Sequence, residues 1–321
     1  MSTTPTPPVS GTPGEEAGLG TLDRDDARAV EAGAGGTRPR RGGREGSKVF
    51  VRAALLVVCL VWTIPTIGLL ISSFRERDAI TSSGWWTVFA NPLEFTRLTF
   101  ENYGEVLEAG MGAAFINSLA VTIPATIIPV LMAAFAAYAF AWMRFPGREV
   151  LFTLVVALLV IPLQVAFIPL LRLFGQFGLN GTFLAVWLAH TGFGMPLAVY
   201  LLRNYMSSMP REVIESAKVD GASHYQTFWR LMIPLSVPAL AAFAIFQFLW
   251  VWNDLLVALI FLGGGDNEVV TIALQQLVGA RGQDWYILTA GAFITMIVPL
   301  LVFFGLQRYF VRGLTAGSVK G

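Results

Sequence analysis

Charged residues are scarce in this chain of 321 residues, at 13% of the total. Soluble domains carry about 25%. Hydrophobic residues, in contrast, make up 55%. This imbalance argues against an ordinary water-soluble domain and makes a lipid bilayer the first solvent to consider. The net charge of +1 also provides no overall attraction to nucleic acid, so no nucleic-acid partner is expected.

Reactive and metal-binding side chains are equally few. A single cysteine, Cys59, cannot form a disulfide within one chain. The two histidines, His190 and His224, are far apart in sequence, and neither stands in a metal-ligand pattern. The patterns G-x4-G-K-[ST], H-E-x-x-H and G-x-S-x-G are absent. The sequence therefore predicts no catalytic residues, no metal site and no phosphate-binding loop.

The first part of the chain differs in composition from the rest. Residues 1–48 are rich in proline, glycine, alanine, threonine and mixed charges, and no aromatic residue precedes Phe50. Such a segment cannot bury enough apolar surface to offset the entropy lost on ordering. We expect a disordered cytoplasmic tail over 1–48 and a transmembrane domain over 49–321. Because a long polar segment precedes the first apolar run, that run is expected to be retained rather than cleaved as a signal peptide.

Six apolar stretches follow, each long enough to cross a bilayer, which takes about 20 residues in a helix. They cover residues 51–73, 113–140, 150–171, 183–202, 237–262 and 286–310. Several contain proline, which membrane bundles tolerate because neighbouring helices satisfy the freed carbonyls. The sequence thus predicts an all-α integral membrane protein with six transmembrane helices.

Basic residues alternate between the two ends of these stretches. They gather before the first span and after the second, fourth and sixth. Lysine and arginine close to span ends are retained on the cytoplasmic side. We therefore expect both termini and the loop after the fourth span to be cytoplasmic. Trp85, Trp86 and Trp285 fit the external interface, where aromatic side chains concentrate.

The loop after the fourth span, residues 210–234, has helix signals of its own. Acidic residues occupy the first turn of a possible helix, and Gly221 can adopt the positive φ that ends one. Ser223 followed by Gln226 is a capping-box pattern that starts a second helix, which Pro234 is expected to end. The sequence predicts two short helices joined at a tight corner.

The spacing within this loop also carries a resemblance. Glu215-Ser216-Ala217, then Gly221, then Leu231-Met232-Ile233-Pro234 is similar to the pattern E-A-A-x3-G-x9-I-x-L-P, the EAA loop of binding-protein-dependent ABC importer permeases. The chain departs from it at Ser216, Leu231 and Ile233. In that family the loop docks into a cytoplasmic ATPase subunit, so the resemblance implies a coupling loop. The residues that it implicates are Glu215, Ser216, Ala217, Asp220, Gly221, Ala222 and Pro234. An amphipathic loop lying on the membrane surface is the alternative.

A second resemblance concerns the cargo. The stretch 247–261, QFLWVWNDLLVALIF, and the final run 306–321 look like the sugar-importing permeases of the maltose type, and 209–265 looks most like α-glucoside importers. This resemblance implies a second homologous permease, two ATPase subunits that use ATP and Mg²⁺, and an external sugar-binding protein. The chain itself would bind no cofactor and would not be an enzyme. Its place would be the bacterial cytoplasmic membrane.

Polar side chains inside spans are costly in hydrocarbon and usually face a partner helix or a water-filled pathway. Sugars are bound by hydrogen bonds together with aromatic contact. We therefore take Gln247, Trp250, Asn253 and Asp254, in the expected fifth span, as candidates for the substrate pathway. Trp250 and Asp254 would share one face of that helix. Hydrogen bonding between helices is the alternative for each.

Two other classes of membrane protein are alternatives to a permease. An ion-coupled transporter or channel is expected to carry ionisable residues within its spans and paired repeats with broken helices. Asp254 is the only carboxylate well inside an expected span, and no repeat is evident. A membrane-embedded enzyme would need a cluster of catalytic groups, which the sequence does not show.

The charge pattern makes a testable prediction about topology. With Cys59 replaced, a cysteine introduced at Trp85 should react with a membrane-impermeant thiol reagent added to intact cells, and so should one at Asn267. A cysteine at Gly221 should react only after the cells are opened. Strong labelling of position 221 from outside, with none at 85, would reverse the proposed orientation.

Overall fold

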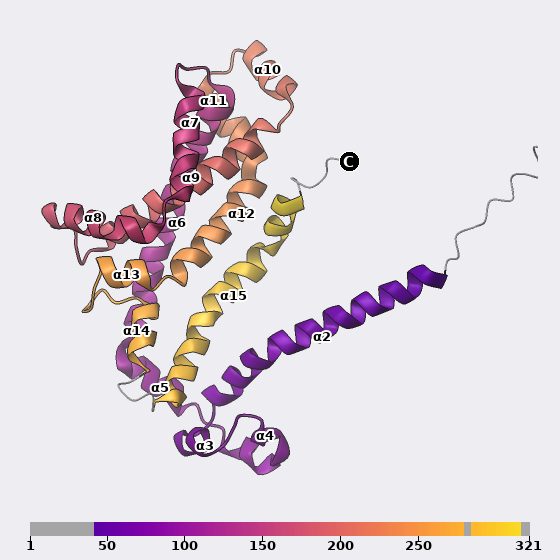
Figure 1. Cartoon of the computed structure of the whole chain (residues 1–321), viewed down its shortest axis with the longest axis vertical. Coiled ribbons are helices and arrows are strands. Elements are labelled where there is room, and N and C mark those ends of the chain that lie inside the picture. The colour runs from indigo at the N-terminus through magenta and orange to yellow at the C-terminus, as the bar shows by residue number, and fades with distance from the viewer. Residues whose placement is uncertain (1–41, 279–283, 316–321) are drawn as a thin grey trace, which may run out of the picture. The chain divides into compact units, whose positions relative to one another are not determined.

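The computed structural model describes residues 42–278 and 284–315, and every element named in these ranges is helical (Figure 1). Their only strand-like feature is an isolated bridge between Arg75 and Leu98. The predicted all-α class is confirmed. The chain divides after Val61 into two units, which are described separately.

The first unit contains the beginning of α2 (Gly42–Ser73), a helix of 32 residues. Its part from Lys48 onward is long and apolar enough to cross a membrane, as predicted for the first span. Large apolar side chains from Val49 to Val61 are exposed, which suits a helix surrounded by lipid. The helix begins at Gly42, ahead of the tail boundary predicted at residue 48. The rest of the predicted tail, residues 1–41, lies outside the described residues.

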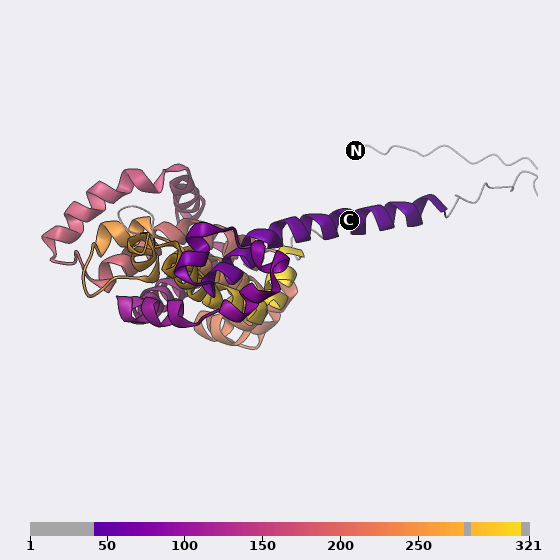
Figure 2. The same ribbon diagram turned by 90° about the horizontal axis from the view of Figure 1, so that it is seen from below.

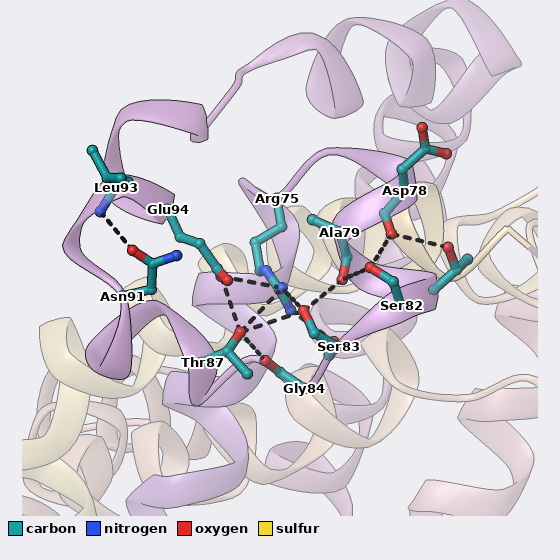
Figure 3. A network of polar contacts seen from close by, with 11 residues as sticks. Arg75, Asp78, Ala79, Ser82, Ser83, Gly84, Thr87, Asn91, Leu93 and Glu94 are labelled. Carbon is teal, nitrogen blue, oxygen red and sulfur yellow. Dashed lines mark hydrogen bonds and ion pairs between the residues drawn. The ribbon is translucent and has the colours of Figure 1, made fainter.

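The second unit begins with the end of α2, followed by three short helices, α3 (Arg77–Ser82), α4 (Thr87–Ala90) and η1 (Pro92–Arg97). Arg75 holds this segment together, and only 3% of its side chain is exposed. Its guanidinium donates to the carbonyl and hydroxyl of Ser83 and to the hydroxyl of Thr87, and it lies 3.4 Å from the Glu94 carboxylate (Figure 3). One buried cation therefore joins the parts of the segment.

Four long helical segments make the bundle of this unit. α5 (Glu101–Val106), η2 (Leu107–Met111) and α6 (Gly112–Trp142) follow one another directly, with a kink at Gly110, which has φ +94°. The other three are α9 (Phe183–Ser207), α12 (Ile233–Trp252) and α15 (Trp285–Thr315). α6 and α9 pack through fully buried alanines, which let helix backbones approach closely; they are Ala125, Ala133, Ala134, Ala137, Ala185 and Ala198.

The apolar stretch predicted as the third span forms two helices that meet at a sharp bend. α7 (Arg148–Ala157) continues into the short η3 (Leu158–Val160), and α8 (Leu163–Gln176) then departs at 102°. The turn is visible from two directions (Figures 1 and 2). Pro162 explains it, because a proline disfavours helical backbone at the residue before it, and Ile161 is extended. Five helices among the described residues can each span a membrane, and this bent pair makes a sixth if counted as one span.

The predicted fifth span is wrong at its C-terminal end. α12 stops at Trp252, and the chain continues through α13 (Leu256–Phe261) and α14 (Val270–Gln276). The Asp254 carboxylate accepts hydrogen bonds from the backbone amides of Val257 and Ala258, at 2.9 and 3.1 Å, and so caps α13. Asp254 therefore does not share a helix face with Trp250. The sequence predicts one continuous helix here, whereas Asp254 marks the start of a new helix.

The Arg75 contacts make a prediction about stability. Arg75→Leu leaves Glu94, whose side chain is 21% exposed, without its cation. We expect a cost of about 2–3 kcal/mol, so that the segment 74–100 opens roughly 30- to 150-fold more often. Chymotrypsin should then cleave the purified protein near Trp85 and Phe89 correspondingly faster.

Arg77→Leu is the matched control. The Arg77 side chain is 58% exposed, and it pairs with Asp284 at 3.7 Å, a surface contact worth about 0–1 kcal/mol. Equal cleavage rates for the two variants would show that Arg75 does not hold the segment together.

Candidate functional site

The corner predicted at Gly221 is present. α10 (Arg211–Val219) ends where the Gly221 amide donates to the carbonyl of Lys218 at 3.0 Å and the Ala222 amide donates to that of Ala217 at 2.9 Å. These two hydrogen bonds make a Schellman motif, which needs left-handed backbone at the first residue beyond the end of the helix. Gly221 is that residue, with φ +77°. A Cβ added to Gly221 would meet nothing within 4 Å, so the need for glycine lies in the backbone rather than in packing.

The second predicted helix also begins where expected. α11 (His224–Thr227) starts with a complete capping box, in which the Ser223 hydroxyl accepts from the Gln226 amide and the Gln226 side chain accepts from the Ser223 amide. The prediction that Pro234 ends this helix is wrong. α11 continues through a π-helical turn, η4 (Phe228–Met232), into α12. Pro234 is the second residue of α12, directly after the π-helical turn.

We call residues 210–234 the coupling segment, after the role that its resemblance implies. It packs onto the bundle by one face. Ile214, Phe228 and Met232 are buried in a cluster with residues of α6 and α9. The ring of Phe228 stacks on that of Phe135 of α6, with the centroids 4.5 Å apart. The segment is therefore fixed to two spans and continuous with a third.

The opposite face of the coupling segment is exposed. Among the residues predicted from the EAA pattern, Ala217 and Ala222 are half-buried, and the exposed ones are Glu215, Ser216, Asp220, Gly221 and Pro234. Val219 and Tyr225 are also exposed, at 86% and 72%. The prediction missed these two, although a large apolar side chain on the outer face of a polar helix marks a contact surface. We call the exposed side of α10, the corner and α11 the docking surface.

A further contact that the sequence did not indicate joins the coupling segment to α6. The Tyr138 hydroxyl lies 2.9 Å from Nδ1 of His224 in a hydrogen bond. His224 is exposed, and the bond joins it to a tyrosine 86 residues earlier in the chain. Nothing in the spacing of the two residues predicts this pair.

Of the four predicted pathway residues, Gln247 is wholly buried within the bundle. Its Nε2 donates to the backbone carbonyl of Ala125 on α6 at 3.2 Å and to that of His190 on α9 at 3.4 Å. A Cβ at Gly194 would lie 2.7 Å from Gln247 Oε1, so glycine there leaves the space that the amide fills. Gln247 therefore joins three spans, which is the alternative role of hydrogen bonding between helices given for it above.

Several buried polar atoms near this contact have no hydrogen-bond partner among the described residues. They come from α6, α9 and α12 and are Thr126 Oγ1, His190 Nδ1, Thr191 Oγ1 and Gln247 Oε1. Buried polar atoms without partners are uncommon and call for an explanation such as bound water or a functional role. The centre of the bundle is therefore more polar than its alanine-rich contacts indicate.

A cavity of about 310 Å³ lies beside Gln247, between the bend at η3 and α8 and the helices α9 and α12. Its walls are mainly apolar and aromatic, with Phe193, Phe246 and Trp250 among them. This size and lining are typical of small ligand pockets. Of the predicted pathway residues, Gln247 and Trp250 line the cavity.

Asn253 and Asp254 have other surroundings. The Asn253 amide donates back to the carbonyl of Leu249 in its own helix, at 2.7 Å. Asp254 caps α13, its backbone carbonyl accepts from the Thr271 hydroxyl, and its carboxylate lies 3.8 Å from His190 Nε2. The structure thus brings Gln247 and Trp250 together at the cavity and places the other two residues at the break between α12 and α13.

Comparisons with known proteins agree with this architecture. A protein of Synechocystis described as an osmoprotective compounds uptake permease, GgtD, is 63% identical over 275 residues, or 85% of this chain and 92% of that relative. The alpha-glucoside transport system permease AglG of Rhizobium meliloti is 46% identical and matches 84% of this chain and 97% of its own. Both relatives are permeases by description.

A solved structure has the same fold. It is the crystal structure of a bacterial ABC transporter involved in the import of the acidic polysaccharide alginate, with a TM-score of 0.70 at 21% identity, covering 85% of this chain and all of the matched one. The family described as binding-protein-dependent transport system inner membrane component matches residues 125–316. The coupling segment and the helices from α7 to α15 lie within that range, and α6 begins before it. The chain belongs to this family of ABC importer permeases.

Proposed function

We propose that this chain is one of two membrane-spanning subunits of an ATP-driven importer for a di- or oligosaccharide, with an α-glucoside as the favoured cargo. The observation that carries the role is the coupling segment, which is fixed to α6 and α9, continues into α12 and exposes its other face. The cargo class rests on the maltose-type resemblance and on the 46% identity to an alpha-glucoside permease.

The partners follow from the same proposal. A second, homologous permease completes the pathway, and an external sugar-binding protein delivers the cargo. Two cytoplasmic ATPase subunits bind ATP and Mg²⁺, and this chain binds neither. The chain lies in the bacterial cytoplasmic membrane with both termini on the cytoplasmic side. The docking surface, together with Pro234 of α12, contacts an ATPase subunit. The residues of the docking surface predicted for this contact are Glu215, Ser216, Ala217, Asp220, Gly221 and Ala222.

Alternating access gives this arrangement its mechanism. When ATP closes the two ATPase subunits, their movement shifts the docked coupling segments, and each segment displaces the spans to which it is fixed. The bundle then opens outward to receive sugar from the binding protein. After hydrolysis the ATPases separate, and the pathway opens inward.

The sugar pathway is proposed to pass the cavity beside Trp250. An indole face provides apolar contact with a sugar ring, and the cavity has room for a small ligand. Gln247 shapes the wall, while Asn253 and Asp254 keep the break between α12 and α13 in place. These four residues therefore contribute to the pathway, with Trp250 closest to the role predicted from the sequence.

Uptake by cells tests the cargo. Deleting the gene should abolish accumulation of a radiolabelled α-glucoside at micromolar concentration and leave amino-acid uptake intact, and the restored gene should return it. Loss of amino-acid or peptide uptake alone would reject a sugar importer. The similarity to an osmoprotective compounds permease supports a second cargo class. A deletion strain that takes up α-glucosides normally but loses protection at high salt would favour that class.

Substitution of Gly221 tests the coupling role. Gly221→Val places a β-branched residue at φ +77°, which should cost about 1–3 kcal/mol and distort the corner without unfolding the spans. Binding-protein-stimulated ATP hydrolysis and sugar uptake by the assembled complex should fall together. Glu215→Arg should act in the same direction by reversing a charge on the docking surface.

Gly221→Asn is the matched control. Asparagine tolerates the left-handed conformation, and the space around position 221 is open, so this variant should stay close to the parent. The purified chain alone should hydrolyse no ATP. If Gly221→Val and Glu215→Arg both transport like the parent at normal membrane levels, the segment is not the coupling element.

A further inference from the structure

The contact between Tyr138 and His224 joins two parts of the molecule that the proposed mechanism requires to move together. Tyr138 lies near the C-terminal end of α6 and is 5% exposed, and His224 is the first residue of α11. The Tyr138 hydroxyl is 2.9 Å from His224 Nδ1, and the two ring centroids are 6.0 Å apart at an interplanar angle of 70°. A side chain of the coupling segment is thus bonded directly to a span.

The position of His224 within the coupling segment matters. It follows the corner at Gly221 by three residues, and its helix is started by the capping box of Ser223 and Gln226. The backbone at His224 is therefore fixed to the corner by local hydrogen bonds. The His224 ring, and through it the Tyr138 hydroxyl, is therefore connected to the corner by a short series of bonds.

Aromatic packing around this pair does not provide the same constraint. Phe228 stacks on Phe135 with the centroids 4.5 Å apart and contacts Tyr138 edge-on at 5.5 Å. Stacking joins two ring faces without fixing any single pair of atoms, whereas a hydrogen bond constrains both the distance and the direction between two atoms. The Tyr138–His224 hydrogen bond therefore adds a directional contact between the coupling segment and α6, beside the apolar packing of Phe228 on Phe135 and Tyr138.

We propose that Tyr138 and His224 are positioning residues whose hydrogen bond passes movement of the coupling segment to α6. This inference rests on the proposed function, since it assigns a route for coupling within the importer. α6 is the span packed along α9 and bonded to Gln247 of α12, so a shift of α6 reaches the bundle beside the cavity. Loss of the bond should leave the subunit folded and make ATP hydrolysis less productive.

The test uses the complete complex in proteoliposomes, with the amount of sugar transported measured per ATP hydrolysed. Tyr138→Phe removes the hydroxyl and leaves His224, which is exposed, free to bond to water. His224→Leu removes the other partner. Because a single hydrogen bond is worth about 0.5–1.5 kcal/mol, we expect each change to lower this ratio roughly 2- to 10-fold. The double variant should be no worse than either single one, since both remove the same bond.

A conservative variant separates positioning from a general structural role. In His224→Asn the side-chain amide can place a hydrogen-bonding atom close to where Nδ1 lies, so the ratio should return toward the parent value. If the variants reduce ATP hydrolysis and uptake equally, the ratio stays constant and the proposal is overturned. The same conclusion follows if His224→Asn is as defective as His224→Leu.

A readout that needs no cargo distinguishes this proposal from the proposed function. With Cys59 replaced, Arg144→Cys just beyond the end of α6 accepts an environment-sensitive fluorophore on an exposed position. ATP with vanadate should change its emission in the parent complex, and Tyr138→Phe should reduce that change. A parent complex that shows the emission change but transports no sugar contradicts the cargo assignment alone. An unreduced change in Tyr138→Phe contradicts the positioning role alone.

Discussion

Hydrocarbon offers no hydrogen bonds, so every backbone amide and carbonyl at membrane depth must find its partner within the protein. The departures from straight helix in this chain are organised around that constraint. At the bend after η3, Pro162 brings no amide that would need a partner. At the break after α12, the Asp254 carboxylate takes two amides of α13, and its carbonyl takes the Thr271 hydroxyl. Both interruptions thus leave fewer backbone amides without a partner.

The same constraint limits what the sequence can reveal. Hydropathy identifies apolar runs without saying whether one helix or two satisfy the backbone. The spans built on α6, α9 and α15 were predicted correctly because one helix covers each apolar run, despite the polar residues and prolines within it. The runs 150–171 and 237–262 look alike in composition, but one bends at Pro162 and the other stops at Trp252. The sequence predicts Asp254 as a polar residue within a span, because a residue that caps a new helix can be recognised only once the break before that helix is known.

The coupling segment was more predictable than the spans. Its features depend on local chemistry, namely the left-handed glycine at 221 and the reciprocal bonds of Ser223 and Gln226, and local chemistry is encoded in neighbouring residues. The Tyr138–His224 bond, and the fit of Gln247 against Gly194, join residues far apart in the chain. Neither the periodicity nor the spacing of residues in the sequence predicts such pairs, because the contacts form only when the helices pack.

The π-helical turn at Phe228–Met232 has a consequence for direction. Such a turn holds one more residue than the α-helical turn that it replaces, and an α-helix rotates by about 100° per residue. If the same residues formed regular α-helix instead, everything before them would be turned by about 100° around the α12 axis. The docking surface would then point to a different side of that axis with all of its side chains unchanged. The wider turn, as much as the composition of the stretch, sets where the surface faces.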